Sequence, residues 1–241
     1  MASRRQVIAD DLREQISTGR IKAGERLPSE AKLATRYTAP TLRSALAILQ
    51  GEGLVEKIHG RGNFVRYPLR RITYIGGGRT SDMATPPPAP LRINVRATQL
   101  HARGHLASLL RVPASSPLTE FLCLCHDGNS PHSLAHIYVP RDLAPVDGYD
   151  ESLWHEGVDS RLAQLRPPLA EVQEQVTARF PTPSEAATLR ISSALPVLAI
   201  TRLAADTTGR VVEAALLVLP GDRADALFTN RTTREERGTE G

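Results

Sequence analysis

The protein has 241 residues, of which 41% are hydrophobic, and a formal net charge of +4. This length favours two domains, since hydrophobic cores usually divide at about 100–200 residues. No apolar run approaches the roughly 20 residues that span a bilayer, and the first residues lack an apolar core of signal-peptide length. The two cysteines, Cys123 and Cys125, lie too close together for a structural disulfide framework. We therefore expect a cytoplasmic protein.

The positive charge is concentrated in the first third of the chain. Residues 1–71 contain 14 Lys and Arg against 7 Asp and Glu, whereas the remainder contains 16 against 19. This asymmetry predicts a polyanionic partner for the first part only. The alternative is a solvated surface that happens to be basic.

Three helices are predicted in this basic segment. Apolar residues recur at four-residue spacing through residues 4–17, which indicates an amphipathic helix. A second helix is predicted from Ser29, a good N-cap residue, to about Tyr37. The third has Pro40 near its start, where a missing N–H costs nothing, and its apolar positions follow the i, i+3, i+4, i+7 pattern. Those positions, which should face a core, are Leu42, Ala45, Leu46 and Leu49.

A short hairpin is predicted after the third helix. Leu54-Val55 and Phe64-Val65 are strand-forming pairs, and the tip between them reads His59-Gly60-Arg61-Gly62. A helix pair followed by a basic, glycine-containing hairpin is typical of proteins that place one helix in a DNA groove and a wing on the adjacent backbone.

Several ordered motifs within residues 4–66 make this interpretation more specific. The segments GRIKAGERLPSEAKLATRY, TLRSALAIL and GLVEKIHGRGNFV resemble the winged helix-turn-helix of GntR-type bacterial transcription regulators. The resemblance implies DNA contacts from the start of the second helix, the recognition helix and the wing. The residues at and beside these positions are Glu30, Ala31, Lys32, Thr38, Pro40, Thr41, Arg43, Ser44, His59, Gly60 and Arg61.

Two departures from the family pattern concern DNA recognition. The turn at Tyr37–Thr41 is about two residues shorter than usual and lacks a basic residue, and Ala31 replaces the usual arginine. Fewer arginines able to pair with guanine predict a different operator, since one bidentate contact contributes about 1–3 kcal/mol of discrimination. Arg43 itself could contact a base or a phosphate, because half or more of protein–DNA hydrogen bonds go to the backbone.

Residues 67–90 are predicted to be a linker. Arg70-Arg71 could add phosphate contacts, and Ile72–Ile75 could form a short strand. The glycines at 76–78 predict a flexible joint, and the proline-rich run at 86–90 predicts a stiff, extended segment.

Residues 91–230 are predicted to form a second domain of mixed helices and strands. Adjacent hairpins with few crossover helices favour an antiparallel α+β sheet. Helices are expected at Gln99–Leu110, at Ser152–Leu165 and from a cap at Ser184 to Leu189. Strands are expected at Leu118–Cys125, His132–Val139, Leu169–Phe180, Pro196–Ala204 and Val211–Leu219. Residues 231–241 are polar and are expected to form a flexible tail.

The order of these elements, with Tyr138-Val139-Pro140 and Gly209–Glu213, is similar to the effector domain of the HutC-like GntR subfamily. This UTRA-type domain has a chorismate-lyase-like fold and senses small polar metabolites. The resemblance places effector contacts at Cys123, Cys125, Ala135, Arg202 and Glu213. Relatives carry arginines at the two cysteine positions and glutamate at Ala135. Because a buried anion needs paired donors, we expect a less polar effector, or none.

Other interpretations of these residues remain open. Cys123 and Cys125, with His126, His132 and His136 nearby, could form a metal or redox site, although zinc requires about four ligands. Simple packing of the cysteines is the alternative. Arg202 and Glu213 could form an ordinary cross-strand ion pair instead of a ligand site.

We therefore predict a DNA-binding transcription regulator, a homodimeric repressor that binds a pseudo-palindromic operator under the control of a small-molecule effector. We expect no cofactor, no metal and no membrane partner. In one alternative, the second domain serves only dimerisation and DNA binding is independent of any effector. In another, the protein is a lyase-type enzyme, but residues 91–241 provide no nucleophile–base pair, and fold alone does not confer chemistry.

Overall fold

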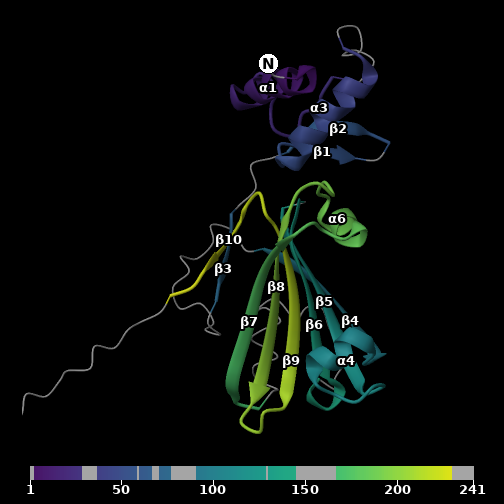
Figure 1. The fold of residues 1–241 in the computed structure, drawn as a ribbon, viewed down its shortest axis with the longest axis vertical. Coiled ribbons are helices and arrows are strands. Elements are labelled where there is room, and N and C mark those ends of the chain that lie inside the picture. Colours follow the sequence, from purple (N-terminus) through teal and green to yellow (C-terminus); the bar gives the residue numbers. More distant parts are fainter. Residues whose placement is uncertain are drawn as a thin grey trace, which may run out of the picture.

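The computed structural model of the protein describes residues 3–28, 37–58, 60–66, 71–76, 91–128, 130–144 and 167–229. The described elements form two groups that follow one another along the long axis in Figure 1. We call residues 3–66 the winged-helix unit and residues 71–229 the sheet unit.

The winged-helix unit contains two described helices and a hairpin. Helix α1 (Arg4–Ser17) packs on helix α3 (Ala39–Gly51), and strands β1 (Val55–Ile58) and β2 (Gly62–Val65) follow. The range of α1 and the hairpin are as predicted from the sequence. The four apolar positions of α3 are also buried as predicted, namely Leu42, Ala45, Leu46 and Leu49.

The wing is tied to the segment that follows α1. Val65 pairs with Val55 in the hairpin, and on its other side its carbonyl accepts a hydrogen bond from the backbone N–H of Gly24 at 2.8 Å. The N–H of Leu27 donates to the carbonyl of Asn63 at 2.9 Å. Strand β2 therefore has backbone partners on both sides, which fixes the wing against the segment that follows α1.

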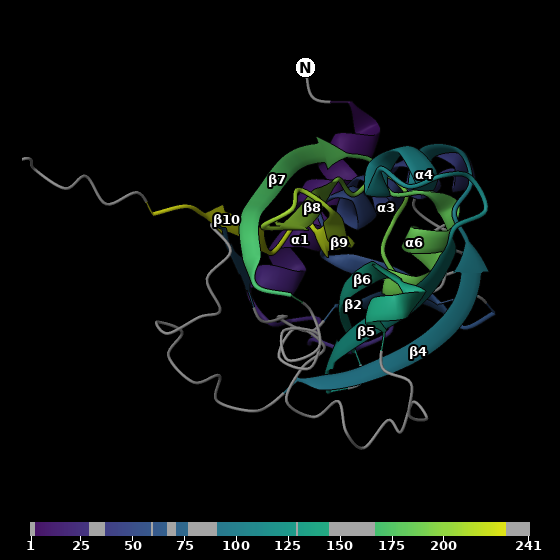
Figure 2. The same cartoon turned by 90° about the horizontal axis from the view of Figure 1, so that it is seen from below.

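The sheet unit is built on one six-stranded sheet that is antiparallel throughout, as expected. Its strands, in spatial order, are β4 (Arg92–His101), β5 (Pro117–Asp127), β6 (Ser130–Pro140), β9 (Val211–Pro220), β8 (Val197–Asp206) and β7 (Leu169–Arg179). The short 3-10 helix η1 (Arg141–Leu143) follows β6. Figure 2 shows that the sheet is strongly curved, with β4 and β7 at its two edges.

Different elements cover the two faces of this sheet. Helices α4 (Gly104–Leu110) and α6 (Pro183–Leu189) pack against one face. Strands β3 (Ile72–Ile75) and β10 (Ala224–Leu227) form a separate parallel pair that packs on the opposite face. Strand β3 lies within the predicted linker, where the sequence had suggested a short strand. It pairs with residues about 150 positions away along the chain.

Two predictions about local structure were wrong. The helix expected at Gln99–Leu110 begins only at Gly104, because residues 99–101 continue β4 and pair with β5. The cap of α6 is Thr182 and not Ser184, since the Thr182 hydroxyl accepts the N–H of Glu185 and Pro183 occupies the first turn. The helices expected from Ser29 and from Ser152, and the tail after residue 230, lie outside the described residues.

Candidate nucleic-acid interface and small-molecule site

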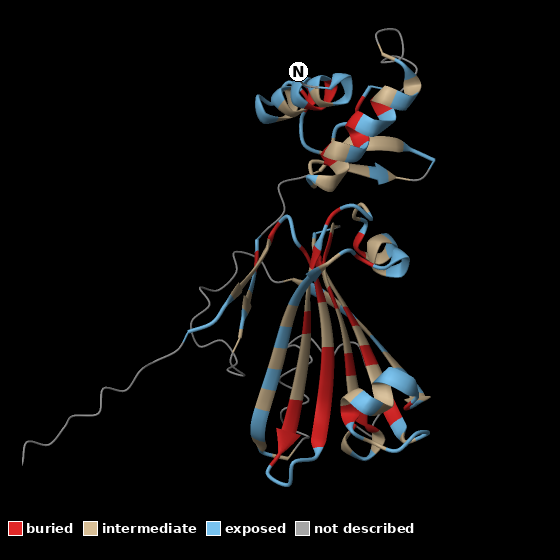
Figure 3. Ribbon diagram, viewed as in Figure 1, coloured by how far each residue is buried: buried red, intermediate tan, exposed pale blue. Residues whose placement is uncertain are grey.

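Helix α3 has one buried and one exposed side, which Figure 3 shows as a red stripe beside pale blue segments. Arg43 and Ser44 are exposed, Pro40 is exposed at the start of the helix, and Thr41 is half-buried. The core side thus packs into the buried cluster of the unit, which also contains residues of α1 and of the wing. The N-terminal half of α3 presents its polar side chains to the outside, as a helix that enters a DNA groove must.

The first turn of α3 holds its hydroxyl groups in a local network. Thr38, the N-cap, has its hydroxyl 2.7 Å from that of Thr41, and the Ser44 hydroxyl donates to the Pro40 carbonyl at 3.0 Å. Only one of the two threonine hydroxyls is needed as the donor in their shared bond. The hydrogen of the other threonine hydroxyl is available to an external acceptor such as a phosphate oxygen.

The tip of the wing is exposed and carries a positive charge. Gly60 has a φ of 73°, a left-handed conformation that favours glycine. The Arg61 guanidinium lies 5.6 Å from the centre of the Phe64 ring, a cation–π geometry. The Gln50 amide donates to the Asn63 side chain at 3.0 Å, which joins the end of α3 to the wing. The predicted DNA-contacting residues Glu30, Ala31, Lys32 and His59 lie outside the described residues.

The five residues predicted to contact an effector all lie on the face of the sheet opposite α4 and α6. They form two groups. Cys123 pairs directly with Ala135 across β5 and β6 and belongs to an apolar cluster with Phe121 and Ile137. Cys125 follows on the same face of β5. This first group is apolar, and Cys123 is buried.

The second group is charged. The Arg202 guanidinium donates to Glu213 Oε1 at 2.5 Å and lies 3.8 Å from Glu174 Oε1, which accepts the Tyr74 hydroxyl at 2.7 Å. The Glu213 side chain is only 2% exposed. Three strand spacings separate β5 from β8, about 14 Å in a regular sheet. The structure therefore brings the predicted residues to one face but does not bring them all into contact.

Tyr74 and Glu174 also belong to this charged group and were not predicted from the sequence. A signal for Glu174 was present, because it lies between Val172 and Val176 at the inward positions of an alternating strand. A charged residue at an inward position needs a buried partner. Tyr74 had no such signal, since its contact depends on β3 folding back over the sheet.

His136, one of the histidines close to the cysteines in the sequence, lies on the other face of the sheet. His136 lies opposite Leu122 on the helix-covered face and makes a 2.8 Å hydrogen bond with Glu120. Burial, and secondarily the charge of Arg92, lowers the pKa of His126. Within the described ranges, no three His, Cys, Asp or Glu side chains are grouped so as to hold a metal ion.

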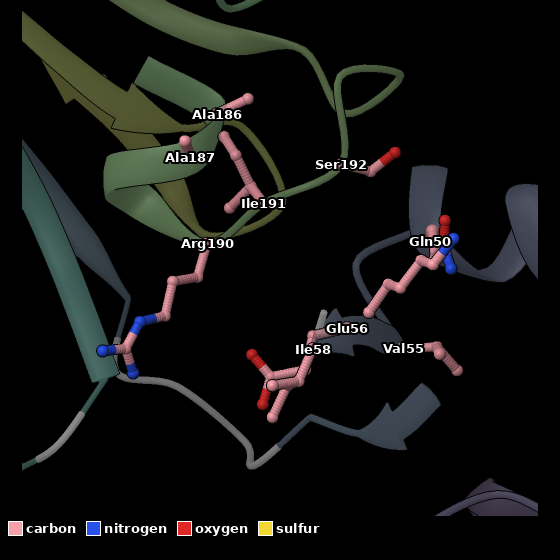
Figure 4. A pocket seen from close by; sticks show the side chains of 10 residues that line it. Gln50, Val55, Glu56, Ile58, Ala186, Ala187, Arg190, Ile191 and Ser192 are labelled. Atoms are coloured by element: carbon pink, nitrogen blue, oxygen red, sulfur yellow. The ribbon is translucent and has the colours of Figure 1, made fainter. Parts of the chain in front are cut away.

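A cavity of about 380 Å³ lies where the two units meet (Figure 4). The end of α3 and strand β1 supply one wall, with Gln50, Val55, Glu56, Lys57 and Ile58. Helix α6 and the residues after it supply the other, with Ala186, Ala187, Arg190, Ile191 and Ser192. The cavity mixes apolar side chains with both signs of charge.

Comparison with known protein families identifies both units. Residues 4–65 match the family described as bacterial regulatory proteins, gntR family, and residues 92–225 match the UTRA domain. The chain belongs to the GntR family and carries a UTRA domain. As a HutC-like GntR regulator it is a sequence-specific DNA-binding transcription regulator and not an enzyme. Among the described residues of this GntR regulator, no helix combines the length and apolarity needed to cross a membrane.

Individual relatives extend over nearly the whole chain. The HTH-type transcriptional repressor NagR of Bacillus subtilis is 26% identical over 220 residues, which cover 90% of each chain. The histidine utilization repressor of Klebsiella aerogenes is 27% identical over 213 residues, 87% of each. The solved structure of PhnF from Mycobacterium smegmatis is 20% identical and shares the fold with a TM-score of 0.56, covering 93% of this chain and 99% of that chain.

Proposed function

We propose that this GntR regulator is a homodimeric, cytoplasmic repressor that binds a pseudo-palindromic DNA operator through residues 1–66. The observation that carries the proposal is the division of α3 into a buried apolar side and an exposed side with Arg43 and Ser44. The proposed DNA contacts are Glu30, Lys32, Thr38, Pro40, Thr41, Arg43, Ser44, His59, Gly60 and Arg61. Two relatives that match most of the chain are named repressors, which supports repression over activation.

Two copies are proposed because one short helix reads few base pairs. A dimer places two recognition helices about one helical turn of DNA apart and doubles the base contacts. Residues 91–230 would hold the two copies together, and residues 67–90 would connect them to the DNA-binding part.

We further propose that a small molecule binds the face that carries Cys123, Cys125, Ala135, Arg202 and Glu213. Arg202 already faces two carboxylates, Glu213 at 2.5 Å and Glu174 at 3.8 Å. An anionic ligand at Arg202 would meet that negative charge, so a neutral or weakly polar effector fits better than a phosphorylated one. The apolar group around Cys123 would pack against the apolar part of this ligand.

A second candidate function is DNA binding without any effector, with residues 91–230 serving only dimerisation. It is favoured by the same observation, because Arg202 has a charged partner and Cys123 is buried among apolar neighbours. Titration of candidate neutral metabolites into the protein–operator complex separates the two. A change in operator affinity supports the effector, and constant affinity over many compounds supports the alternative.

The experiment that tests DNA binding starts from a random duplex library. Selection with the purified protein should enrich a two-fold symmetric sequence, and sedimentation should show two chains per duplex. Operator affinity should fall linearly on a log–log salt plot with a slope of about −0.9 for each phosphate neutralised. Failure to enrich any sequence would reject the proposal, and one chain per duplex would reject the dimer.

A further inference from the structure

Arg66 and Asp222 join the two units although they lie 156 residues apart. Arg66 follows β2, and its guanidinium Nη1 donates to Asp222 Oδ2 at 2.7 Å and to the Gly53 carbonyl at 3.2 Å. Only 8% of the Arg66 side chain and 16% of the Asp222 side chain are exposed. The two side chains are thus mostly covered, although Asp222 sits in an exposed turn, and the pair joins a residue of the winged-helix unit to a residue of the sheet unit.

Two glycines allow the carboxylate to come this close. Gly53 has a φ of 74°, and a Cβ built on it would lie 2.5 Å from Asp222 Oδ2. Gly221 positions the turn that carries Asp222, since its N–H donates to the Pro196 carbonyl at 2.9 Å. A Cβ on Gly221 would lie 2.6 Å from that same carbonyl oxygen. The approach of Asp222 to the winged-helix unit therefore requires glycine at both positions, because a Cβ atom at either one would clash.

No apolar core is shared between the units in the part of the chain that the structure describes. The buried cluster of the winged helix draws only on residues 8–65, and the clusters of the sheet unit begin at Ile72. The cavity of Figure 4 occupies part of the junction instead. Since no buried apolar cluster spans the two units, polar contacts such as this ion pair hold the junction, and removal of one partner would leave the other charge uncompensated.

Arg223 lies beside this pair and is incompletely satisfied. It is 3% exposed, its Nη2 donates to the Pro131 carbonyl at 2.8 Å, and its Nε and Nη1 have no hydrogen-bond partner among the described residues. Burial, and next the charge of Arg66, lowers the pKa of Arg223 to about 10. The Asp222 carboxylate thus lies near both Arg66 and Arg223, and it is hydrogen-bonded to Arg66 of the winged-helix unit.

We propose that the Arg66–Asp222 pair is a latch that docks the winged helix on the sheet unit, and that Arg223 receives Asp222 when the latch opens. The exchange replaces one ion pair by another, so the docked and released states stay close in energy and a small bias moves the protein between them. Because a ligand in the cavity between α6 and β1 would contact both units, it would favour the docked state.

A disulfide across the junction can measure docking directly. A Cβ built on Gly51 would lie 3.8 Å from the Cβ of Ala194, which is the mean separation in disulfides. The full chain with Gly51→Cys and Ala194→Cys is equilibrated in glutathione buffers. The free thiols are then trapped, and peptide mapping gives the ratio of the disulfide to the free-thiol form. This ratio gives the effective concentration of the two cysteines. The two single-cysteine variants control for reactions of Cys123 and Cys125.

In this background Asp222→Asn and Arg66→Gln should each lower the effective concentration about tenfold or more, because each removes the ion pair between the units and leaves one mostly covered charge uncompensated in the docked state. The variant with both changes should have an effective concentration no lower than that of either single variant, since both changes break the same interaction. Asp225→Asn is the matched control, because it removes the neighbouring but exposed pair with Arg71. Values within about twofold of the parent for both latch variants would overturn the proposal.

The role of Arg223 has its own test. With the latch weakened by Arg66→Lys, Arg223→Gln should raise the effective concentration several-fold, because the competing partner is gone. Gln keeps a donor for the Pro131 carbonyl, and thermal unfolding verifies that the fold is retained. An unchanged or lowered value would remove Arg223 from the mechanism and leave the latch. None of these readouts uses DNA or an effector, so their failure is distinct from failure of the proposed repressor function.

Discussion

Arg202 on β8 and Glu213 on β9 form an ion pair of 2.5 Å on a face of the sheet where Glu213 keeps only 2% of its side chain exposed. Glu174 from β7 lies 3.8 Å from the same guanidinium and accepts a hydrogen bond from Tyr74 on β3. The charged group thus links the proposed effector face to the strand that follows the winged helix.

Replacement of Arg202 by Met should destabilise the protein strongly. Removal of one partner of a buried ion pair leaves the other charge poorly compensated and costs about 3–5 kcal/mol. Urea denaturation followed by circular dichroism measures the loss. Arg210→Met is the matched control, since the Arg210–Asp142 pair is exposed and should contribute about 1 kcal/mol or less. Equal losses in the two variants would contradict the assigned burial of the Arg202 network.

Replacement of Arg43 by Ala should weaken operator binding by about 1–3 kcal/mol, or roughly 5- to 150-fold. Fluorescence anisotropy with the selected operator and with single-base variants distinguishes the two possible contacts. A base contact predicts relaxed preference at one position, whereas a phosphate contact predicts uniform weakening and a salt slope lower by about 1. Arg96→Ala, an exposed position on β4, should leave affinity unchanged. Unchanged affinity for the Arg43 variant would reject its role.

The start of α6 should become less stable in acid. Two hydrogen bonds from Arg179, together with the backbone of Thr182, lower the pKa of Glu185 from its usual 4.5 to about 2. A depressed carboxyl pKa contributes stability above the unfolded value, and the contribution is lost as pH falls from about 4.5 to about 2.

The matching variant is Glu185→Gln. It should lower the free energy of unfolding at pH 7 by about 1–2 kcal/mol, a figure reduced for solvent screening because Arg179 is partly exposed. The difference from the parent should shrink towards pH 2. Glu171→Gln, at an exposed position of β7, provides the control. A constant difference across this pH range would contradict the assignment.

A second pH effect should arise at His126. Burial and the nearby charge of Arg92 lower its pKa in the folded protein, so the unfolded chain binds the proton more readily. The contribution of His126 to the free energy of unfolding is therefore complete above about pH 6.5, the pKa of histidine in the unfolded chain. It is lost as the pH falls below that value. His126→Gln should flatten the pH dependence of the unfolding midpoint between pH 8 and 5.5. His105→Gln, at an exposed position of α4, is the matched control.

Much of the local structure could be predicted from the sequence. The ranges of α1 and the wing hairpin, and the four buried positions of α3, followed from helical and strand periodicity. Such periodicity reflects burial of neighbouring residues on one face, which a single segment encodes by itself. The error at Gln99 has the same origin, because apolar spacing over a few residues did not show that β5 continues to pair there.

The candidate sites were only partly accessible to this reasoning. The family resemblance predicted five effector-contacting positions. All five lie on one face of the sheet, but they form two separate groups, one apolar and one charged. Tyr74 joined the charged group without any signal in the sequence, because its position depends on the pairing of β3 with β10.

The sequence by itself determined the class of the protein, the helix that we propose to face DNA and the hairpins, since each depends on residues close together in the chain. Only the tertiary structure decided the strand order, the parallel β3–β10 pair and the contact of Arg66 with Asp222. Pairings over such separations depend on which edges and charges remain exposed once each unit has formed its core. That information is distributed over the whole chain and cannot be found in any one segment.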